Sequence, residues 1–347
     1  MSATTEPAVV RHEIDHEGDP RRRTYTFGGA DPVASLAPGT ILETSTLDAF
    51  GGRLRSAGQR ATQLFDTRYA NPQTGPFYVE GAEEGDALAA HFVSIEPREN
   101  YGVSANLPLF GALTATSLTA LLNQPLPEMT WIYGIDRDAR VVRYEAHDSD
   151  FRVELPLDPM HGTVGVAPAL GEVRSSMVPG PWGGNMDTPE MRAGVTCYLG
   201  VNVAGALFSL GDGHARQGEG ETCGVAVETA MDSVVVVDLL KGVPTPWPRL
   251  ESDDYIMTAG STRPLEDAFR IAHTEIIRWV MELTGLSLLD AYQLVTQTAE
   301  TPVANVVDPS YTVVVKVAKK YLPGVEIMGG MHERLRRLGS AGGARLA

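Results

Sequence analysis

The stretch GALFSLGDGHARQGEGETCGVAVE, residues 205–228, changes character halfway along its length. It begins as an apolar, strand-like run at residues 206–210. Two pairs of ionisable residues follow, each pair two positions apart: Asp212 with His214, and Glu219 with Glu221. Residues two apart point to the same face of an extended chain. Each pair is therefore expected to present its side chains to one cavity.

These residue types together favour a metal centre. Carboxylates and an imidazole that share one cavity repel one another or lose hydration unless a cation or water satisfies them. Asp212 and His214 are predicted to be metal ligands, and Glu221 is predicted to be either a ligand or the general base. The plainer alternative is a loop aspartate that caps backbone amides beside a hydrogen-bonded histidine. Glu228, after an apolar run, is expected to hold the ligands in place.

The first part of this stretch, GALFSLGDGHARQGEGE, closely resembles the signature of the acetamidase/formamidase family of amidohydrolases. Five further blocks resemble the family and lie in its order: PGTILETSTLDAFGG from Pro38, NPQTGPFYVEGAEEGD from Asn71, GEVRSSMVPGPWGGNMD from Gly171, DDYIMTAGSTRPLEDAF from Asp253 and LTGLSLLDAY from Leu283. The resemblance extends over residues 38–323. One departure is Glu219, where relatives carry Asp, and this leaves the role of Glu219 open.

The order of patterns along the chain predicts a mainly β protein with α+β elements. Short apolar runs alternate with Gly and Pro through residues 24–250, which we expect to form a β-rich body that carries the site. Residues 131–144 have the pattern of a β-hairpin. Residues 106–124 suggest a loop with a short helix. The family resemblance implies a β-sandwich or barrel-like body, in agreement with this pattern.

Helical periodicity begins after Thr258 and predicts a helical segment, residues 251–330, packed on the body. Three helices are expected, at residues 264–285, 287–299 and 308–321. Residues 1–23 are expected to form an N-terminal tail or an added edge strand, and residues 331–347 a C-terminal tail.

Composition narrows the range of partners. The formal net charge is -16, which argues against nucleic acid and anionic membranes because both attract basic surfaces. No run of ~18 consecutive apolar residues predicts a membrane span. Only two cysteines are present, Cys197 and Cys223, so no disulfide framework is implied, and two reduced, buried thiols are expected. The charged N-terminus lacks an apolar segment of signal-peptide length, and we expect a cytoplasmic location.

The position of the first lysine tests other amidase chemistries. No lysine precedes Lys241, so Ser175 and Ser176 have no upstream lysine for a Ser-Ser-Lys mechanism. A nitrilase-type order of Glu, Lys and Cys is absent for the same reason, since neither cysteine follows a lysine. The G-x-S-x-G motif of a Ser-His-Asp hydrolase is also missing from the sequence. Metal-assisted hydrolysis remains by elimination as well as by motif.

Further candidates come from the ends of predicted strands. Asp48 is predicted as a third metal ligand or a catalytic carboxylate, and Glu80 as a proton shuttle; Glu43 is a weaker candidate. Asn185 and Asp187 are predicted to bind the substrate amide, because a carboxylate and an amide match its donors and acceptor. Their alternative is an Asx-turn. Three other residues have plainer expectations: a surface or structural role for His161, a pocket wall or core position for Trp182, and turn positions for Glu83 and Asp86.

We therefore expect a metal-dependent amidohydrolase that cleaves formamide or acetamide to ammonia and a carboxylate by means of metal-bound hydroxide. Zinc suits the mixed ligands best, with calcium or manganese as alternatives. The resemblance implies a homodimer or a larger homo-oligomer. Two alternatives stay open, namely hydrolysis of another carbon–nitrogen bond in a urea-like or cyclic amide, and a non-catalytic metal-binding β-rich protein.

Overall fold

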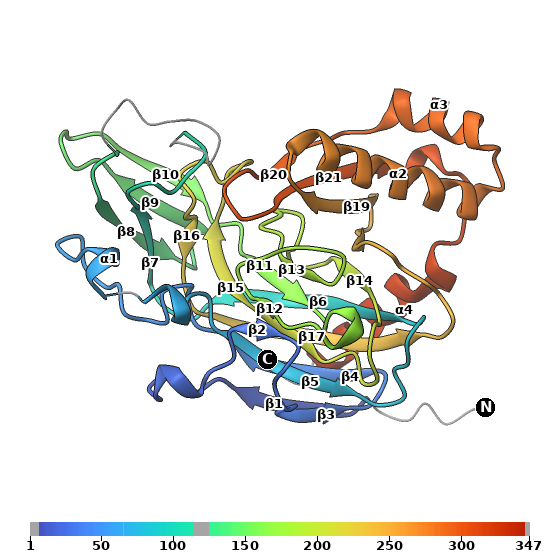
Figure 1. Cartoon of the computed structure of the whole chain (residues 1–347), viewed down its shortest axis with the longest axis horizontal. Coiled ribbons are helices and arrows are strands. Elements are labelled where there is room, and N and C mark those ends of the chain that lie inside the picture. The colour runs from blue at the N-terminus through green and yellow to red at the C-terminus, as the bar shows by residue number, and fades with distance from the viewer. Residues whose placement is uncertain (1–6, 65, 114–124, 344–347) are drawn as a thin grey trace.

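The computed structural model describes residues 7–64, 66–113 and 125–343, and two large open sheets form most of it (Figure 1). The first sheet has the order β1 (Val9–Glu13), β4 (Thr40–Ser45), β17 (Met231–Leu240), β6 (Ala87–Pro97), β14 (Thr196–Gly200), β18 (Arg249–Glu251), β19 (Tyr255–Thr262), β21 (Tyr311–Ala318) and β20 (Val303–Asn305). Its strands are antiparallel except for β1, which pairs parallel to β4.

The second sheet carries the stretch that the sequence singled out. Its order is β10 (Arg152–Pro156), β9 (Val141–Glu145), β8 (Met129–Asp136), β7 (Tyr101–Asn106), β16 (Val227–Glu228), β15 (Phe208–Arg216), β11 (Met160–Gly165) and β13 (Gly183–Asn185). β5 (Gln73–Val79) also pairs with β15, and β3 (Ala34–Leu36) pairs with β5. A separate ribbon joins β12 (Arg174–Ser175) to β2 (Thr26–Phe27).

In the part of the chain that the structure describes, the helices are few and short except near the C-terminus. They are α1 (Ala61–Leu64), α2 (Leu265–Thr284), α3 (Leu288–Thr298) and α4 (Met331–Gly343), with 3-10 turns η1 (Pro20–Arg22), η2 (Thr67–Tyr69), η3 (Ala169–Gly171), η4 (Lys319–Tyr321) and η5 (Met328–Gly330). Among the described residues, no helix is both long and apolar enough to cross a membrane.

The main core lies between the two sheets. Phe77 and Phe208 from the second sheet pack in one buried cluster with Leu42, Phe92 and Val235 from the first. Such face-to-face burial is the arrangement of a β-sandwich. The sandwich expectation is confirmed, and the barrel expectation is not, because neither sheet closes on itself.

Helices α2, α3 and α4 cover the other face of the first sheet (Figure 1). In α2, Ala272, Ile276 and Val280 are buried against the sheet residues of this second cluster. The backbone of α2 lies close to β19, since a side chain at Gly260 would come within 2.5 Å of the Ala268 carbonyl oxygen. Two of the three expected helices are thus confirmed as α2 and α3, and the left-handed Gly285 ends α2 as expected.

The third expected helix is wrong. Residues 311–318, YTVVVKVA, form β21, which pairs with β19 along its whole length. Its four valines and one threonine are β-branched and favour a buried strand, and this preference outweighs the helix-start pattern at Asp308 and Pro309. The segment after Thr258 therefore holds strands of the first sheet as well as helices.

The expected tails differ from the structure in two places. Residues 9–13 form β1 at the sheet edge, in line with the edge-strand alternative. Residues 331–343 form α4 where a tail was expected, and its apolar residues Met331 and Leu335 are buried in the helix-side core. The hairpin expected at 131–144 is confirmed by β8 and β9. The expected short helix within 106–124 lies partly outside the described residues, and residues 107–113 contain no helix.

Candidate metal centre and active-site cavity

A cavity of about 480 Å³ lies beside β15 and β16. The loop that follows β7, residues 107–110, and the loop of residues 221–225 also line it. Its polar side is formed by eight side chains: Asn71, Asn185, Asp187, Asp212, His214, Glu221, Glu228 and Asp308. β15 runs through the middle of the molecule between β11 and β16 (Figure 1), so it delivers its side chains to the centre of the second sheet.

Strand β15 positions the two residues on which the prediction rested. Asp212 and His214 lie two apart on this strand and both line the cavity, as their spacing predicted. Asp212 has a φ of 58°, in the left-handed region, so the strand is locally distorted where the ligands lie. The register of β15 with β16 places His214 directly opposite Glu228.

Two groups of side chains have the geometry to hold a cation. In the first, Nε2 of His214 is 3.4 Å from Asp212 Oδ1 and 3.3 Å from Glu228 Oε2. The second consists of His214 with Asp187 and Glu221, and in each group one ligand atom per residue lies within 4.8 Å of the others. These five residues and Asp308 are called the cavity cluster below. All six are buried.

Gln217 fixes which nitrogen of His214 faces the carboxylates. The Gln217 amide nitrogen donates to the backbone carbonyls of Asp187 and Ala304, at 2.6 and 3.1 Å. Its oxygen therefore faces His214 and accepts a hydrogen bond from Nδ1 at 3.0 Å. With the proton on Nδ1, the neutral imidazole presents the Nε2 lone pair to Asp212 and Glu228, as a metal ligand does.

Buried amides hold the carboxylates of the cluster in place. Asn185 donates to Asp187 Oδ2 at 2.9 Å and to Asp308 Oδ2 at 2.7 Å. Asn305 also donates to Asp187 Oδ2, at 2.6 Å, and to Asp308. Asn71 donates to Asp212 Oδ2 at 3.2 Å. Each of these three aspartates therefore has one oxygen anchored by a neutral donor, which leaves its other oxygen for a ligand.

Two carboxylate oxygens in the cavity cluster lack a hydrogen-bond partner although they are buried. They are Asp187 Oδ1 and Glu228 Oε2. A buried unpaired oxygen of this kind costs free energy, and a cation is the partner that the cluster is equipped to take. Space is reserved there as well, because a Cβ on Gly162 would come within 2.3 Å of Asp187 Oδ1 and 2.7 Å of Asp212 Oδ2. The residues present thus fit a metal ion.

The pKa values of four carboxyl groups in the cavity cluster are raised, because these groups are buried close to one another. Burial, followed by the charges of Glu221 and Asp308, raises the pKa of Asp187 well above its ordinary value. Burial likewise raises the pKa of Glu221, and it raises the pKa of Glu228 to about 7 and that of Asp308 to about 6. A bound cation reverses this effect, since it favours the charged form of each carboxylate.

Asp212 and His214 behave as a pair. Burial raises the pKa of Asp212, but the charge and hydrogen bond of His214 outweigh burial and bring that pKa below its ordinary value. Burial lowers the pKa of His214, yet the charges of Glu228 and Asp212 raise it well above the ordinary value. Without another cation, the imidazolium is the counter-ion of these carboxylates.

Two predicted site residues do not reach the cavity. Asp48 is buried, but its Oδ1 accepts a hydrogen bond from the Gly52 backbone at 3.0 Å, and it belongs to neither cation group. It stabilises a turn and does not line the cavity. Glu80 is exposed, one residue beyond the end of β5, and is also absent from the lining. A position at a strand end was therefore a poor guide, because strands end on every side of the sandwich.

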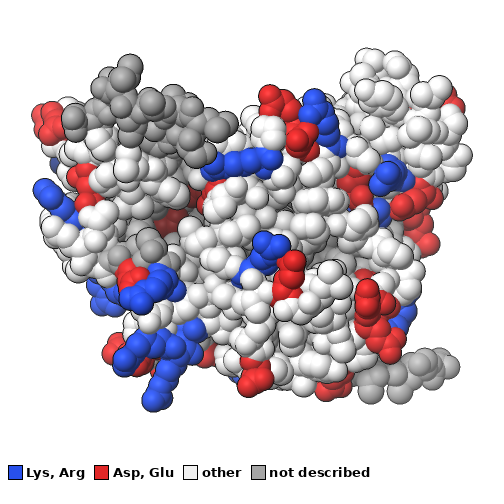
Figure 2. All heavy atoms as spheres, viewed as in Figure 1, with Lys and Arg blue, Asp and Glu red and all other residues white. Residues whose placement is uncertain are grey.

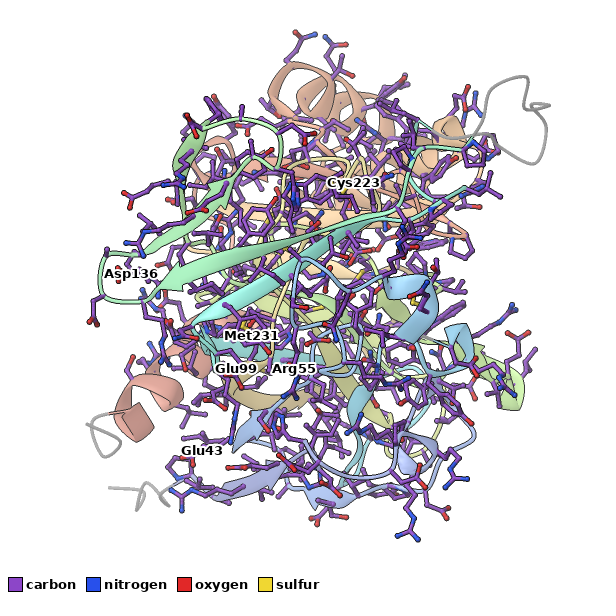
Figure 3. The ribbon with its side chains drawn as sticks, turned by 90° about the vertical axis from the view of Figure 1, so that its left-hand side faces the viewer. Glu43, Arg55, Glu99, Asp136, Cys223 and Met231 are labelled. Carbon is purple, nitrogen blue, oxygen red and sulfur yellow. The ribbon has the colours of Figure 1, made fainter. Side chains whose placement is uncertain are left out.

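Glu219 and Glu43 also lie away from the cluster. The expectation that Glu219 and Glu221 share one face is wrong, because Gly220 and Glu221 both have positive φ and the chain turns there. Glu219 is exposed while Glu221 lines the cavity. Glu43 forms an ion pair with Arg11 on β1. Figure 3 shows Glu43 far from Cys223, which belongs to the loop after Glu221.

Other residues fall mainly into structural roles. His161 is fully buried between the Gly211 carbonyl at 3.0 Å and the Ser233 hydroxyl at 2.7 Å, so its role is structural and its surface alternative is wrong. Trp182 belongs to the main core and Asp86 stabilises a turn at Glu83. Both cysteines are free, with Cys197 buried and Cys223 exposed, so only one of the two buried thiols is confirmed.

Sequence reasoning missed three contributors. Asn71 comes from one segment, and Asn305 and Asp308 come together from another, far along the chain. Asn71 opens one of the family-like blocks, which was a usable signal, whereas Asp308 was taken for a helix start. Asn185 was expected to bind substrate, but its nitrogen and oxygen already have partners within the protein, Asp187, Asp308 and Asn71 among them. Asn185 therefore positions the carboxylates.

The fold and the cavity together define the class, an open two-sheet β protein with a buried carboxylate–imidazole site. The chain belongs to the acetamidase/formamidase family, whose model matches residues 165–317. An acetamidase crystal structure from Yersinia enterocolitica is 38% identical, with a TM-score of 0.84 over 92% of this chain and 94% of that one. An acetamidase from Bacillus halodurans is 31% identical, with a TM-score of 0.80 over 92% and 100%.

Two more distant matches carry less weight. A curated formamidase-type protein of Schizosaccharomyces pombe is 23% identical over 258 residues, which are 60% of this chain and 61% of that protein. The chain thus spans about three fifths of that relative's length. A γ-lactamase from Delftia acidovorans, 19% identical with a TM-score of 0.57, shares the fold alone.

Proposed function

We propose that this chain is a metal-dependent amidohydrolase that cleaves a small aliphatic amide to ammonia and a carboxylate. Family membership supports hydrolysis of the carbon–nitrogen bond in a linear amide. One observation carries the metal: Asp212, His214 and Glu228 each place a ligand atom within 4.8 Å of the others, and Glu228 Oε2 is buried there without a hydrogen-bond partner. A cation satisfies such oxygens where no hydrogen bond does.

Asp212, His214 and Glu228 are the proposed ligands of the ion. A mixed set of carboxylates and imidazole suits zinc or manganese. Calcium fits less well because it takes oxygen ligands and His214 belongs to both cation groups. When bound, such an ion polarises the amide carbonyl and activates a water molecule near neutral pH.

Asp187 and Glu221 are the proposed partners of the amide nitrogen. The unpaired Oδ1 of Asp187 accepts an N–H of the substrate amide and so orients it. Water adds to the carbonyl carbon, the carbon–nitrogen bond breaks, and the nitrogen leaves as ammonia after it takes a proton. Glu221 is buried and lines the same cavity, so its carboxyl is the proposed carrier of that proton.

The test is ammonia release from formamide, acetamide and propionamide, with the purified protein before and after chelation and after addition of zinc, manganese or calcium. We expect chelation to abolish release and one ion to restore it, with metal content measured by mass spectrometry. Release that survives removal of all bound metal would contradict the metal mechanism. A protein that binds metal yet hydrolyses no amide would point to the binding-protein alternative.

The expected homo-oligomer is part of this proposal and is measured by sedimentation.

Variants of two glutamates provide the matched control. Glu221→Gln removes the proposed proton carrier, and we expect kcat to fall on the order of 10²-fold. Glu80→Gln makes the same chemical change at an exposed position outside the cavity. Equal loss in both variants would contradict the assignment of Glu221.

A further inference from the structure

The cavity has a second wall that differs in chemistry from the cavity cluster. Besides its polar side, it is lined by apolar residues from five segments of the chain: Ala49 and Phe50, Ala70, Leu107 to Phe110, Met177, and Val225. Among the described lining residues, all the charged side chains apart from His214 are acidic, and none is Lys or Arg. The cavity therefore joins a site for an amide to a neutral apolar chamber.

The apolar wall is part of a small hydrophobic core. Phe50 and Val225 are buried together with Val103 and Ala105 of β7, and the Phe110 side chain packs against this cluster. Residues that belong to such a core keep their side chains in fixed positions, so the wall is preformed.

The loop that carries Glu221 fixes this wall against the polar side. The Ala112 backbone N–H donates to the Thr222 carbonyl at 2.8 Å. Gly224 has a φ of +90°, and a Cβ there would come within 2.4 Å of the Phe110 ring. Glycine thus allows the ring to lie directly on the backbone of the loop. Val225 of the apolar wall thus lies four residues after Glu221, a member of the cavity cluster.

The cavity is large for the smallest amides. At about 30 Å³ per water molecule in the liquid, 480 Å³ corresponds to on the order of 15 water molecules. Formamide has three non-hydrogen atoms and acetamide has four, so either leaves most of the chamber filled with water. Volumes in this range are typical of sites for ligands of drug size.

We propose that the preferred substrate is a primary amide with a neutral, apolar acyl group of about four to eight carbons, seated against Phe50, Phe110 and Val225. This inference rests on the proposed amide hydrolysis and names the substrate class of the same site. Hydrolysis of such an amide consumes one water molecule and gives ammonia and a medium-chain or aromatic carboxylate. The acidic surroundings disfavour an acyl group that itself carries a negative charge.

A chain-length series tests the inference. The value of kcat/KM is measured for formamide, acetamide, butyramide, hexanamide and benzamide, and for succinamate as the charged analogue of similar length. We expect kcat/KM to rise about fourfold for each methylene from acetamide to hexanamide, the equivalent of ~0.8 kcal/mol for each buried methylene. Succinamate should be hydrolysed at least tenfold less well than butyramide.

The chain-length series separates failure of the acyl-chamber inference from failure of the proposed function. If acetamide is hydrolysed and kcat/KM stays level or falls along the series, the acyl-chamber inference is wrong while the proposed function stands. If no amide in the series is hydrolysed by the metal-loaded protein, the proposed function itself is wrong.

A variant at Phe110 of the apolar wall tests whether this wall causes the preference for longer acyl groups. Phe110→Ala should lower the ratio of kcat/KM for hexanamide over acetamide about tenfold, because only the longer chain reaches the ring. Phe269→Ala is the matched control, since Phe269 is a partly exposed phenylalanine on α2, outside the cavity. An unchanged ratio in folded Phe110→Ala protein, checked by thermal unfolding, would contradict the proposed seat.

Discussion

Among the described residues, two clusters combine histidine with carboxylate side chains, and of these two only the cavity cluster has buried carboxylate oxygens without a hydrogen-bond partner. The second cluster, called the α4 network here, consists of His91, Thr196, His332 and Asp253. Thr196 Oγ lies 2.9 Å from His91 Nδ1 and 2.8 Å from His332 Nδ1. His332 Nε2 lies 3.1 Å from Asp253 Oδ1. A carboxylate, an imidazole and a hydroxyl thus follow one another, as in a hydrolytic triad.

The α4 network nevertheless has the properties of a structural link. If His332 donates from Nε2 to Asp253, its Nδ1 accepts from the Thr196 hydroxyl, and the oxygen of Thr196 accepts from His91, so each of these contacts has a donor and an acceptor. Thr196 is 0% exposed, and a substrate cannot reach its hydroxyl. The network joins α4 to β6 and β14. Both clusters contain histidine and carboxylate side chains. They differ because only the cavity cluster lines a cavity that a substrate can enter and has carboxylate oxygens without a hydrogen-bond partner.

The sharpest test compares one histidine from each cluster. His214→Gln should lower kcat/KM for amide hydrolysis on the order of 10³-fold and leave the fold intact, because it removes a ligand from both cation groups. His332→Gln should leave kcat/KM within twofold and lower the free energy of unfolding by about 1–3 kcal/mol, since it breaks buried hydrogen bonds. The measurements are kcat/KM for amide hydrolysis and the free energy of unfolding in urea, for both variants. A large kinetic loss in folded His332→Gln would remove the distinction between the clusters.

The free energy of unfolding should depend on pH through His91, a member of the α4 network. Burial, and then the nearby His332, lowers the pKa of His91 to about 4; Asp253 opposes this shift, and Arg336 adds a smaller lowering. The unfolded chain has an ordinary histidine pKa of about 6.5 and binds more protons between pH 6.5 and 4. The free energy of unfolding should therefore fall as pH falls through this range, by about 2–3 kcal/mol for this residue.

The matching variant isolates that contribution. His91→Gln should flatten the decline in the free energy of unfolding between pH 7.5 and 4.5, as measured by urea denaturation. An unchanged decline would show that His91 is not the group whose protonation destabilises the fold.

A smaller effect is expected from the residue that orients His214. Gln217→Leu removes the acceptor at Nδ1 and should lower metal affinity or kcat by about 10–100-fold, the usual effect of such a supporting contact. Gln217→Glu keeps an acceptor there and should recover most of the loss. Nitrogen NMR of the imidazole gives the tautomer directly. Loss of activity without a change of tautomer or metal affinity would contradict the positioning role.

The smallest expected effect lies on the surface. Glu83→Gln removes one exposed partner of Lys241, and we expect the free energy of unfolding to change by less than about 1 kcal/mol. Kinetic constants should not change, because Glu83 does not line the cavity. Figure 2 shows such acidic and basic side chains interleaved over the face in view. A measurable kinetic effect would mean that surface charge, and not only the cavity cluster, governs activity.

Much of the local structure could be predicted because it depends on neighbours in sequence. The spacing of Asp212 and His214 placed them on one face of β15, and it did so correctly. Caps and apolar periodicity predicted α2 and α3. The same reasoning failed at residues 311–318, where a helix-start pattern preceded a run of β-branched residues whose partners on β19 are 49 to 63 positions away.

The sequence by itself determined the acidic character of the chain, its β-rich order of elements and the pair of ligands on β15. Only the tertiary structure decided which carboxylates meet them. Strand register brings Glu228 opposite His214, and Asn185 and Asn305 bring Asp187 and Asp308 together although these two aspartates are far apart in the sequence. The physical reason is that side-chain periodicity is a local property, whereas convergence depends on pairing between distant strands and on buried amides that a one-dimensional pattern does not specify.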